Sequence, residues 1–153
     1  MIRNILAALM LCIAACASAE NAQIKPEAND EHEAIFAELA HRSALPRNEL
    51  ESLLADCGAN QQSIYFCAWR DQITAERKLD SMLTAKLDKM PRCKKAIDGE
   101  LARWKKQRDS GCEKSATRDY GEGSLKATAQ IACVTAEIEK RARQATHSSG
   151  CGF

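Results

Sequence analysis

Residues 61–91, QQSIYFCAWRDQITAERKLDSMLTAKLDKMP, decide the fold class. Their apolar positions recur mostly at steps of three and four residues, which places them on one face of a helix. These positions are Ile64, Cys67, Ala68, Ala75, Leu79, Met82, Leu83, Leu87 and Met90. The stretch predicts a helix of roughly eight turns. It begins near Gln61 and stops at Pro91, because proline cannot continue a helix.

Other segments of the chain also carry helical patterns. A short helix is expected from about residue 30 to 41, with acids in its first turn, where the helix dipole favours them. A second short helix opens at Pro46 and is ended by Cys57-Gly58. Two longer helices are expected from about residue 92 to just before 120 and from 125 to about 145. No segment alternates in the manner of a β-strand, so the class is all-α.

The turn between the last two helices reads Gly121-Glu122-Gly123-Ser124. Its glycines supply open backbone, and Ser124 is expected to cap the helix that follows. That last helix has two apolar stripes, which predicts that it is well buried. Long helices joined by short turns pack as antiparallel neighbours. The predicted fold is a small, disulfide-stapled antiparallel helical bundle with long helices and a helical hairpin around the Gly121-Ser124 turn.

The first residues have the features of a signal peptide. Arg3 precedes an uncharged run from Ile5 to Ala19, which is shorter than the roughly twenty residues that span a bilayer. Cleavage after Ala19 fits the small-x-small pattern, whereas the segment ending at Cys16 resembles a lipobox, whose cysteine becomes lipidated. The protein is therefore expected to be periplasmic or secreted. It would be anchored to the envelope by lipid if Cys16 is the processed residue.

Four segments are expected: a signal peptide (1–19), an acidic N-terminal helical extension (20–56), a helical domain (57–145) and a C-terminal tail (146–153). Residues 20–60 hold nine acidic and three basic side chains, and residues 61–153 hold twelve and eighteen. Attraction between the two halves explains this asymmetry, or the acidic segment is a surface for a basic partner. The balanced total lacks the basic excess of nucleic-acid-binding proteins, so no nucleic-acid partner is expected.

Cysteine usage indicates an oxidising compartment. Six cysteines remain after cleavage at Ala19, and an even number in an exported chain is typical of disulfides. They are Cys57, Cys67, Cys93, Cys112, Cys133 and Cys151. Structural zinc is the alternative, but the chain has no Cys-x-x-Cys pair and only His147 lies near a cysteine. Neither a metal nor a cofactor is expected.

The stretch from residue 104 to 141 resembles a known family. In order it contains Trp104, Arg108-Asp109, Cys112, Gly121-Glu122-Gly123-Ser124, Cys133 and Arg141. This order is similar to the pattern Trp…Arg-Asp…Cys…Gly-Gly-Ser…Cys…Arg of the bacterial LprI-like lysozyme-inhibitor family. Upstream, Cys57 and Cys67 followed by Leu79-Asp80 resemble that family's paired cysteines and its Leu-Asn step. The resemblance covers about residues 57–145, with Glu122 standing where a second glycine is common.

The matched residues also have a structural reading. Cys112 and Cys133 flank the predicted hairpin, and a disulfide between them would contribute roughly 3 kcal/mol in the chain-entropy account. This pairing is the first choice and Cys57 with Cys67 the second, while the use of Cys93 and Cys151 stays open. Trp104 and Arg108 are one turn apart, so the guanidinium can stack on the indole. An ordinary packed seam therefore explains Trp104, Arg108, Asp109 and Arg141 as structural residues.

The chain lacks the convergent groups of an enzyme, because His32, His41 and His147 are scattered and no nucleophile elbow or phosphate loop occurs. We expect a binding protein. The resemblance implies an inhibitor of lysozyme-type muramidases, with a lysozyme or another cell-wall hydrolase as partner. Its contacts are expected at the loop, unless the loop is only a turn. The candidate contact residues are Ser124, Gly123, Glu122, Arg118 and Lys126.

Two other functions stay open. The first is an immunity or periplasmic interaction protein directed at a different wall-degrading toxin. The second is an envelope-maintenance protein with no inhibitory role. The sequence does not distinguish them, because both would use the same stapled scaffold with a different surface.

Overall fold

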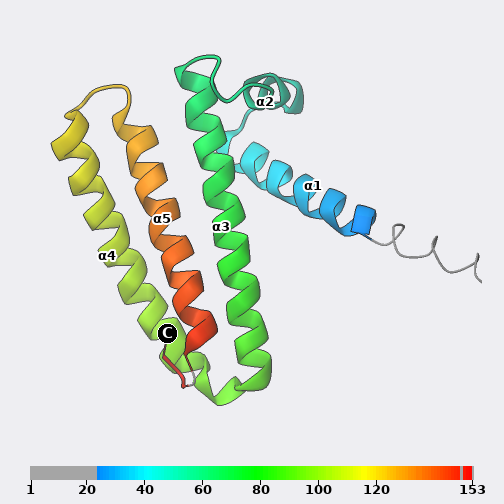
Figure 1. The fold of residues 1–153 in the computed structure, drawn as a ribbon, viewed down its shortest axis with the longest axis vertical. Coiled ribbons are helices and arrows are strands. Elements are labelled where there is room, and N and C mark those ends of the chain that lie inside the picture. The colour runs from blue at the N-terminus through cyan, green and yellow to red at the C-terminus, as the bar shows by residue number, and fades with distance from the viewer. Residues whose placement is uncertain (1–23, 149, 153) are drawn as a thin grey trace, which may run out of the picture. The chain divides into compact units, whose positions relative to one another are not determined.

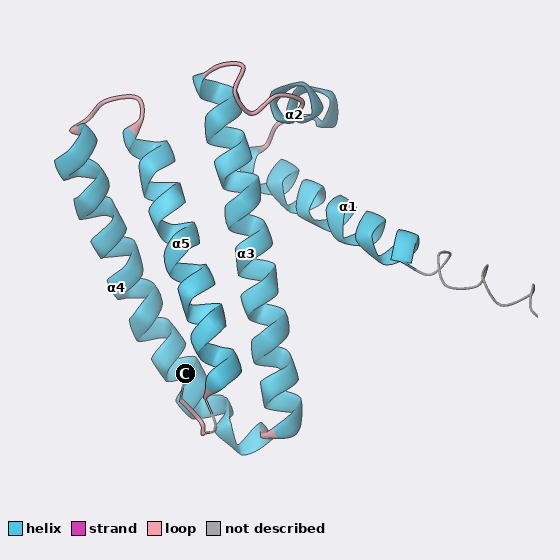
Figure 2. Ribbon diagram, in the orientation of Figure 1, coloured by secondary structure: helices cyan, strands magenta, loops and turns pink. Residues whose placement is uncertain are grey.

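The computed structural model describes residues 24–148 and 150–152 (Figure 1). The predicted signal peptide and the lipidation of Cys16 therefore lie outside the described residues. Five α-helices and one 3-10 turn occur in the described chain, and none of it forms a strand (Figure 2). They are α1 (Ile24–Ser43), α2 (Arg47–Leu54), α3 (Gln61–Lys89), the 3-10 turn Pro91–Cys93, α4 (Lys94–Tyr120) and α5 (Lys126–His147). The all-α prediction is confirmed.

The chain divides into two units after Ala34, so α1 belongs partly to each. This helix begins at Ile24 rather than near residue 30. Pro26 does not prevent the earlier start, because a proline in the first helical turn lacks an N–H group that would have no partner there anyway. The helices that pack together belong to the unit that begins at Ile35.

The long helix α3 begins and ends where local chemistry dictates. Asn60 caps its start, where the Asn60 side-chain oxygen accepts a 3.0 Å hydrogen bond from the Ser63 N–H. At its end the Met90 N–H donates to the Lys86 carbonyl over 2.9 Å, and Pro91 then opens the 3-10 turn that leads into α4. The predicted span of this helix is confirmed.

Helix α5 lies between α3 and α4 and packs against both (Figure 1). The chain order makes α4 antiparallel to α5, as predicted for a hairpin, whereas α3 and α5 run in the same direction. The more extensive contact of α5 is with α3. Neighbours in sequence are therefore not the main packing partners here, because the last helix inserts between the two that precede it.

Helix α3 joins two hydrophobic cores. One end shares a core with α2 and with the part of α1 that follows Ala34, and the other end packs mainly against α5 and the 3-10 turn. The first core contains Phe36, Leu39, Leu50, Phe66 and Ile73. The second contains Ala75, Leu79, Leu83, Cys93, Ile97, Cys112, Val134, Ile138 and Ala142.

Helix α5 is less buried than its two apolar stripes predict. Val134, Ile138 and Ala142 are buried, but Ala132 and Ala136 on the other stripe are exposed. With neighbours only on two sides, the remaining side of the helix faces outward. The prediction of a well-buried helix is therefore wrong for that side.

Three disulfides join residues of the described chain: Cys57–Cys67, Cys112–Cys133 and Cys93–Cys151. The first and second are the two pairs preferred from the sequence, and the third joins the two cysteines left open there. Their Cα–Cα distances of 5.7, 5.5 and 5.0 Å suit disulfide geometry. The tail that carries Cys151 is also held by Lys86, whose Nζ donates to Ser148 Oγ over 2.6 Å and to the Gly152 carbonyl over 2.7 Å.

Candidate functional site

The loop between α4 and α5 needs both of its glycines. Gly121 has a φ of +57°, a conformation that favours glycine, and its N–H donates to the Thr117 carbonyl over 2.8 Å. A Cβ at Gly123 would lie 2.9 Å from the Tyr120 carbonyl oxygen, which a real side chain does not tolerate. That oxygen accepts the Gly123 N–H over 3.0 Å. The loop is thus a tight, defined turn.

Ser124 does not cap α5, so that prediction is wrong. The residue at the cap position is Leu125, and no side chain accepts a hydrogen bond there. The turn into the helix is instead closed by the backbone, because the Lys126 N–H donates to the Gly123 carbonyl over 3.0 Å. Ser124 is exposed, and its hydroxyl makes no hydrogen bond within the described chain.

Exposed apolar side chains gather at this end of the bundle. Among the described residues, the exposed large hydrophobic side chains are Ile64, Tyr120 and Leu125, at 40, 48 and 44 % exposure. Tyr120 and Leu125 flank the loop, and Ile64 stands in the first turn of α3, at the same end of the three long helices (Figure 1). Single exposed apolar residues are ordinary, but here all three belong to the same end of the long helices.

We call residues 118–126 together with Ile64 the tip. All five loop contacts proposed from the sequence fall within it, and its cations are engaged by neighbouring carboxylates. Arg118 Nε donates to Asp119 Oδ1 over 2.8 Å, and this hydrogen bond lowers the pKa of Asp119 and raises that of Arg118. Lys126 Nζ lies 2.9 Å from Glu122 Oε1. The tip therefore presents paired charges, and its available donors are the Ser124 hydroxyl and the backbone N–H groups of Glu122 and Ser124, for which the described structure contains no acceptor.

The motif residues Trp104, Arg108 and Arg141 form a packed seam away from the tip. The guanidinium carbons of Arg108 and Arg141 lie 4.9 and 5.6 Å from the centre of the Trp104 ring. Arg108 pairs with Asp109 over 2.7 Å and Arg141 with Glu100 over 2.5 Å, and the two arginine side chains are only 8 and 11 % exposed. Buried cations need such partners, so this arrangement explains the motif by packing and charge compensation.

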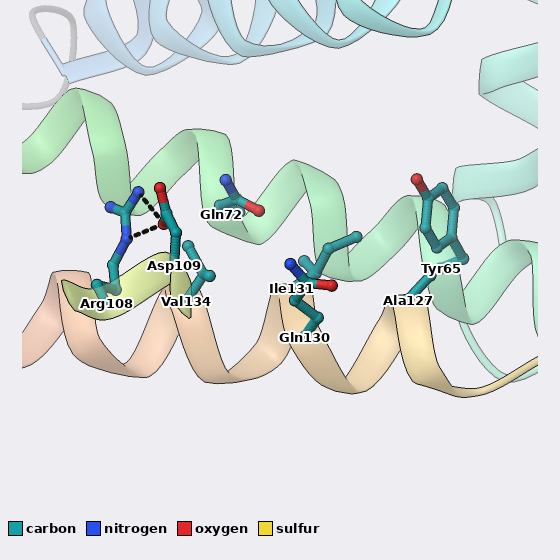
Figure 3. Close-up of a pocket in the computed structure, with 8 residues that line it drawn as sticks. All are labelled: Tyr65, Gln72, Arg108, Asp109, Ala127, Gln130, Ile131 and Val134. Carbon is teal, nitrogen blue, oxygen red and sulfur yellow. Dashed lines mark hydrogen bonds and ion pairs between the residues drawn. The ribbon is translucent and has the colours of Figure 1, made fainter. Parts of the chain in front are cut away.

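A groove follows the face of α5 between α3 and α4 (Figure 3). Its volume is about 330 Å³. Tyr65 lies at one end and the Arg108–Asp109 pair at the other, with the side chains of Gln72 and Gln130 between them (Figure 3). Ala127, Ile131 and Val134 complete the lining. Both the groove and the tip offer hydrogen-bonding groups that the described chain does not use, beside apolar side chains.

The sequence pattern of the lysozyme inhibitor LprI family matches residues 55–145. The chain belongs to the LprI family. The resemblance noted from the sequence is confirmed. The LprI match includes α3, α4, α5 as far as residue 145 and the cysteines of the hairpin, so it covers both the tip and the groove. No curated protein and no solved structure matches the chain.

Membership of the LprI family and three disulfides together indicate an extracytoplasmic protein. None of the described helices is long and apolar enough to cross a bilayer. Within the described part of the chain, no group of three or more His, Cys, Asp or Glu side chains could hold a metal ion. The LprI family is a family of inhibitors, which are typically not enzymes.

Sequence reasoning missed the apolar part of the LprI tip. Leu125 belongs to an apolar stripe of the helix predicted to be well buried, and that prediction is wrong for it. Tyr120 carries no predicted role. Each residue adjoins a glycine-containing turn, where a large apolar side chain has few neighbours to cover it. Ile64 was expected to lie on the packed face of α3, yet it is 40 % exposed because α3 begins only three residues earlier. The sequence feature that could have identified these exposed side chains is their position at the ends of the helices.

Proposed function

We propose that this LprI-family protein binds and inhibits a lysozyme-type muramidase by placing its tip in the enzyme's substrate cleft. The observation that carries the proposal is the coincidence at the tip of exposed Tyr120 and Leu125 with the available donors of Ser124 and Glu122. Protein interfaces commonly depend on a few such anchors, of which tyrosine is among the most frequent.

The chemistry of the donors suits that target. Glycosidases of this kind cleave with a pair of carboxyl groups that flank the scissile bond. A hydroxyl or backbone N–H from the tip can hydrogen-bond a carboxylate that would otherwise act on substrate. Inhibition then needs no reaction by the inhibitor, which acts by occupying the cleft and is not itself an enzyme.

The hairpin that carries the tip is held in shape before binding. Cys112 precedes Gly121 by nine residues and Cys133 follows Leu125 by eight, so their disulfide lies about 12–14 Å from the loop at the helical rise of 1.5 Å. This staple keeps α4 and α5 in register. Preorganisation lowers the entropic cost of binding and so favours affinity.

The acidic N-terminal extension would assist the encounter. Asp30, Glu31 and Glu33 are exposed on α1. Lysozymes are commonly basic, and charge complementarity raises association rates. In this proposal residues 1–19 direct export, residues 20–56 attract the enzyme, residues 57–145 bear the tip, and residues 146–153 close the fold at the Cys93–Cys151 disulfide. Processing at Cys16 would anchor the protein to the membrane.

The test is inhibition of muramidase activity on a cell-wall suspension by the oxidised protein recovered after export from an expression host. Ser124→Arg is compared with Ser81→Arg, because Ser81 is also exposed but lies on α3. We expect stoichiometric inhibition by the natural protein and by Ser81→Arg, and at least tenfold weaker inhibition by Ser124→Arg.

Equal inhibition by both variants would show that the tip does not contact the muramidase. No inhibition of any lysozyme class by folded protein would overturn the proposal. In that case, binding to a different wall hydrolase would favour the immunity function.

A further inference from the structure

The groove on α5 has an apolar floor and polar walls. Ala127, Ile131 and Val134 follow one another at steps of three and four residues on α5 and so share one face of that helix. The walls come from α3, through Tyr65 and Gln72, and from α4 (Figure 3). A volume of about 330 Å³ is at the small end of the range for ligand sites.

Hydrogen-bonding groups in the groove are left unused by the fold. Gln130 is half-buried, and its carboxamide makes no hydrogen bond within the described residues. Gln72 donates from Nε2 to Glu76 Oε1 over 2.7 Å, which leaves its carbonyl oxygen available. Asp109 receives Arg108 at Oδ1, and its Oδ2 has no partner in the described structure. Asp109 is 56 % exposed, and none of these three groups is a buried polar atom that lacks a partner, so water solvates them in the free protein and a ligand would replace that water.

The charge of the groove points to a neutral ligand. Arg108 and Asp109 are the charged side chains that line it, and they neutralise each other over 2.7 Å. An anion or a cation would be attracted by one member of this pair and repelled by the other, so the pair gives little net attraction to either. A neutral molecule with hydroxyl and amide groups can instead bond Gln72 and Gln130 without disturbing it.

The shape favours a short saccharide over a peptide. Ala127 and Val134, the first and last lining residues on α5, are seven residues apart, so the groove is roughly 10 Å long at 1.5 Å per residue. Its walls are helices, whose backbone groups are already paired, so an extended peptide finds no edge to pair with. A helical peptide would need a continuous apolar channel, which the two glutamines interrupt.

We propose that this groove binds an N-acetylated amino sugar within a short glycan. The acetamido group carries one donor and one acceptor, the complement of the Gln130 carboxamide. Its methyl group lies on the floor formed by Ile131 and Val134, and the sugar hydroxyls bond Gln72 and Asp109. This site is separate from the proposed muramidase contact, because it lies in the groove lined by α3, α4 and α5 and not at the loop.

The test is an NMR titration of the oxidised, exported protein with triacetylchitotriose, in the absence of any muramidase. Cellotriose serves as the matched saccharide without acetamido groups. We expect saturable shifts of the Gln130 side-chain amide and the Ile131 methyl signals, with an affinity of about 1 mM because the groove is open. Cellotriose should bind at least about tenfold more weakly, the effect of one lost hydrogen bond.

Gln130→Leu keeps the side-chain volume and removes the carboxamide, and Gln107→Leu, at an exposed site on α4, is its control. Chitotriose affinity should fall about tenfold in the first variant and stay unchanged in the second. Absence of saturable shifts, equal binding of cellotriose, or unchanged affinity in folded Gln130→Leu would each overturn the proposal. Since no enzyme is present, such a result would leave the inhibitory function untouched.

Discussion

The two ends of the three-helix unit formed by α3, α4 and α5 are built in opposite ways. At the end that holds the tail, the Cys93–Cys151 disulfide and two hydrogen bonds from Lys86 tie the chain down, and Cys93 is 1 % exposed. At the tip, Tyr120 and Leu125 are exposed and Ser124 makes no hydrogen bond in the described structure. The tail end is closed by bonds within the chain, whereas the tip leaves hydrogen-bonding and apolar groups available to a partner.

This difference separates stability from binding. Changes at the tail end should destabilise the fold and leave recognition intact, because the tail lies far from the loop (Figure 1). Changes near the tip should affect recognition beyond their effect on stability. Variants of the two ends can therefore test whether the contrast is functional.

The largest effect is expected from Cys93→Ala with Cys151→Ala. This disulfide spans 58 residues, and its removal should lower the free energy of unfolding by about 4 kcal/mol in the chain-entropy account. Chemical denaturation measures the loss. Muramidase inhibition by the fraction that remains folded should be unchanged. A loss of inhibition by the folded fraction would instead indicate that the muramidase contacts the tail end.

Removal of the hairpin staple by Cys112→Ala with Cys133→Ala should cost slightly less stability and more function. The separation is 21 residues, which corresponds to about 3 kcal/mol. Because α4 and α5 then lose their fixed register below the loop, inhibition per folded molecule should weaken, as measured by titration against a muramidase at low temperature. If this variant inhibits as well as the one lacking Cys93–Cys151, preorganisation of the tip is unimportant.

The loop itself is tested by Gly121→Ala. At a φ of +57° a side chain is strained, and we expect a loss of about 1–2 kcal/mol in the free energy of unfolding. Gly111→Ala is the matched control, because this glycine lies within α4 and a Cβ there meets nothing within 4 Å. The control should be stabilised by about 0.5–1 kcal/mol. Thermal melts of both variants separate these opposite signs.

The smallest effect concerns the pH dependence of the tip. The Arg118 hydrogen bond lowers the pKa of Asp119 below its ordinary value of 3.8, so the pair stabilises the fold above that pH and loses its effect as the pH falls through the lowered value. Both groups are exposed, so the contribution is small. NMR titration of the Asp119 carboxyl should show its pKa return toward the ordinary value in Arg118→Gln. An unchanged pKa would rule out Arg118 as the cause.

The helices of this protein could be predicted because their signals are local. Asn60, Pro46 and Pro91 mark boundaries, and the apolar spacing in residues 61–91 fixes the face that packs. The insertion of α5 between α3 and α4 could not be predicted, because it depends on which faces meet in three dimensions. The exposure of Ala132 and Ala136 follows from that arrangement alone.

The candidate site was predictable in part for the same reason. The glycines of the loop predict a turn, and the loop residues around Ser124 could be proposed from that turn as contacts for a partner. The groove combines Gln72 and Gln130, which are 58 residues apart, with Asp109 from a third helix. No local pattern connects such residues. The partner of Cys93 was open for the same reason, since Cys112 lies nearer to it along the chain than Cys151 does.

The disulfides are nested, because the Cys93–Cys151 bond encloses the Cys112–Cys133 bond in sequence. A chain that emerges from its N-terminus first presents Cys93 and then Cys112, well before Cys151 arrives. An oxidant that joins thiols in order of appearance would make Cys57–Cys67 correctly and then couple Cys93 to the wrong residue. Biogenesis of this small protein therefore calls for a thiol-disulfide isomerase, or for an oxidation slow enough to wait until the whole chain has emerged.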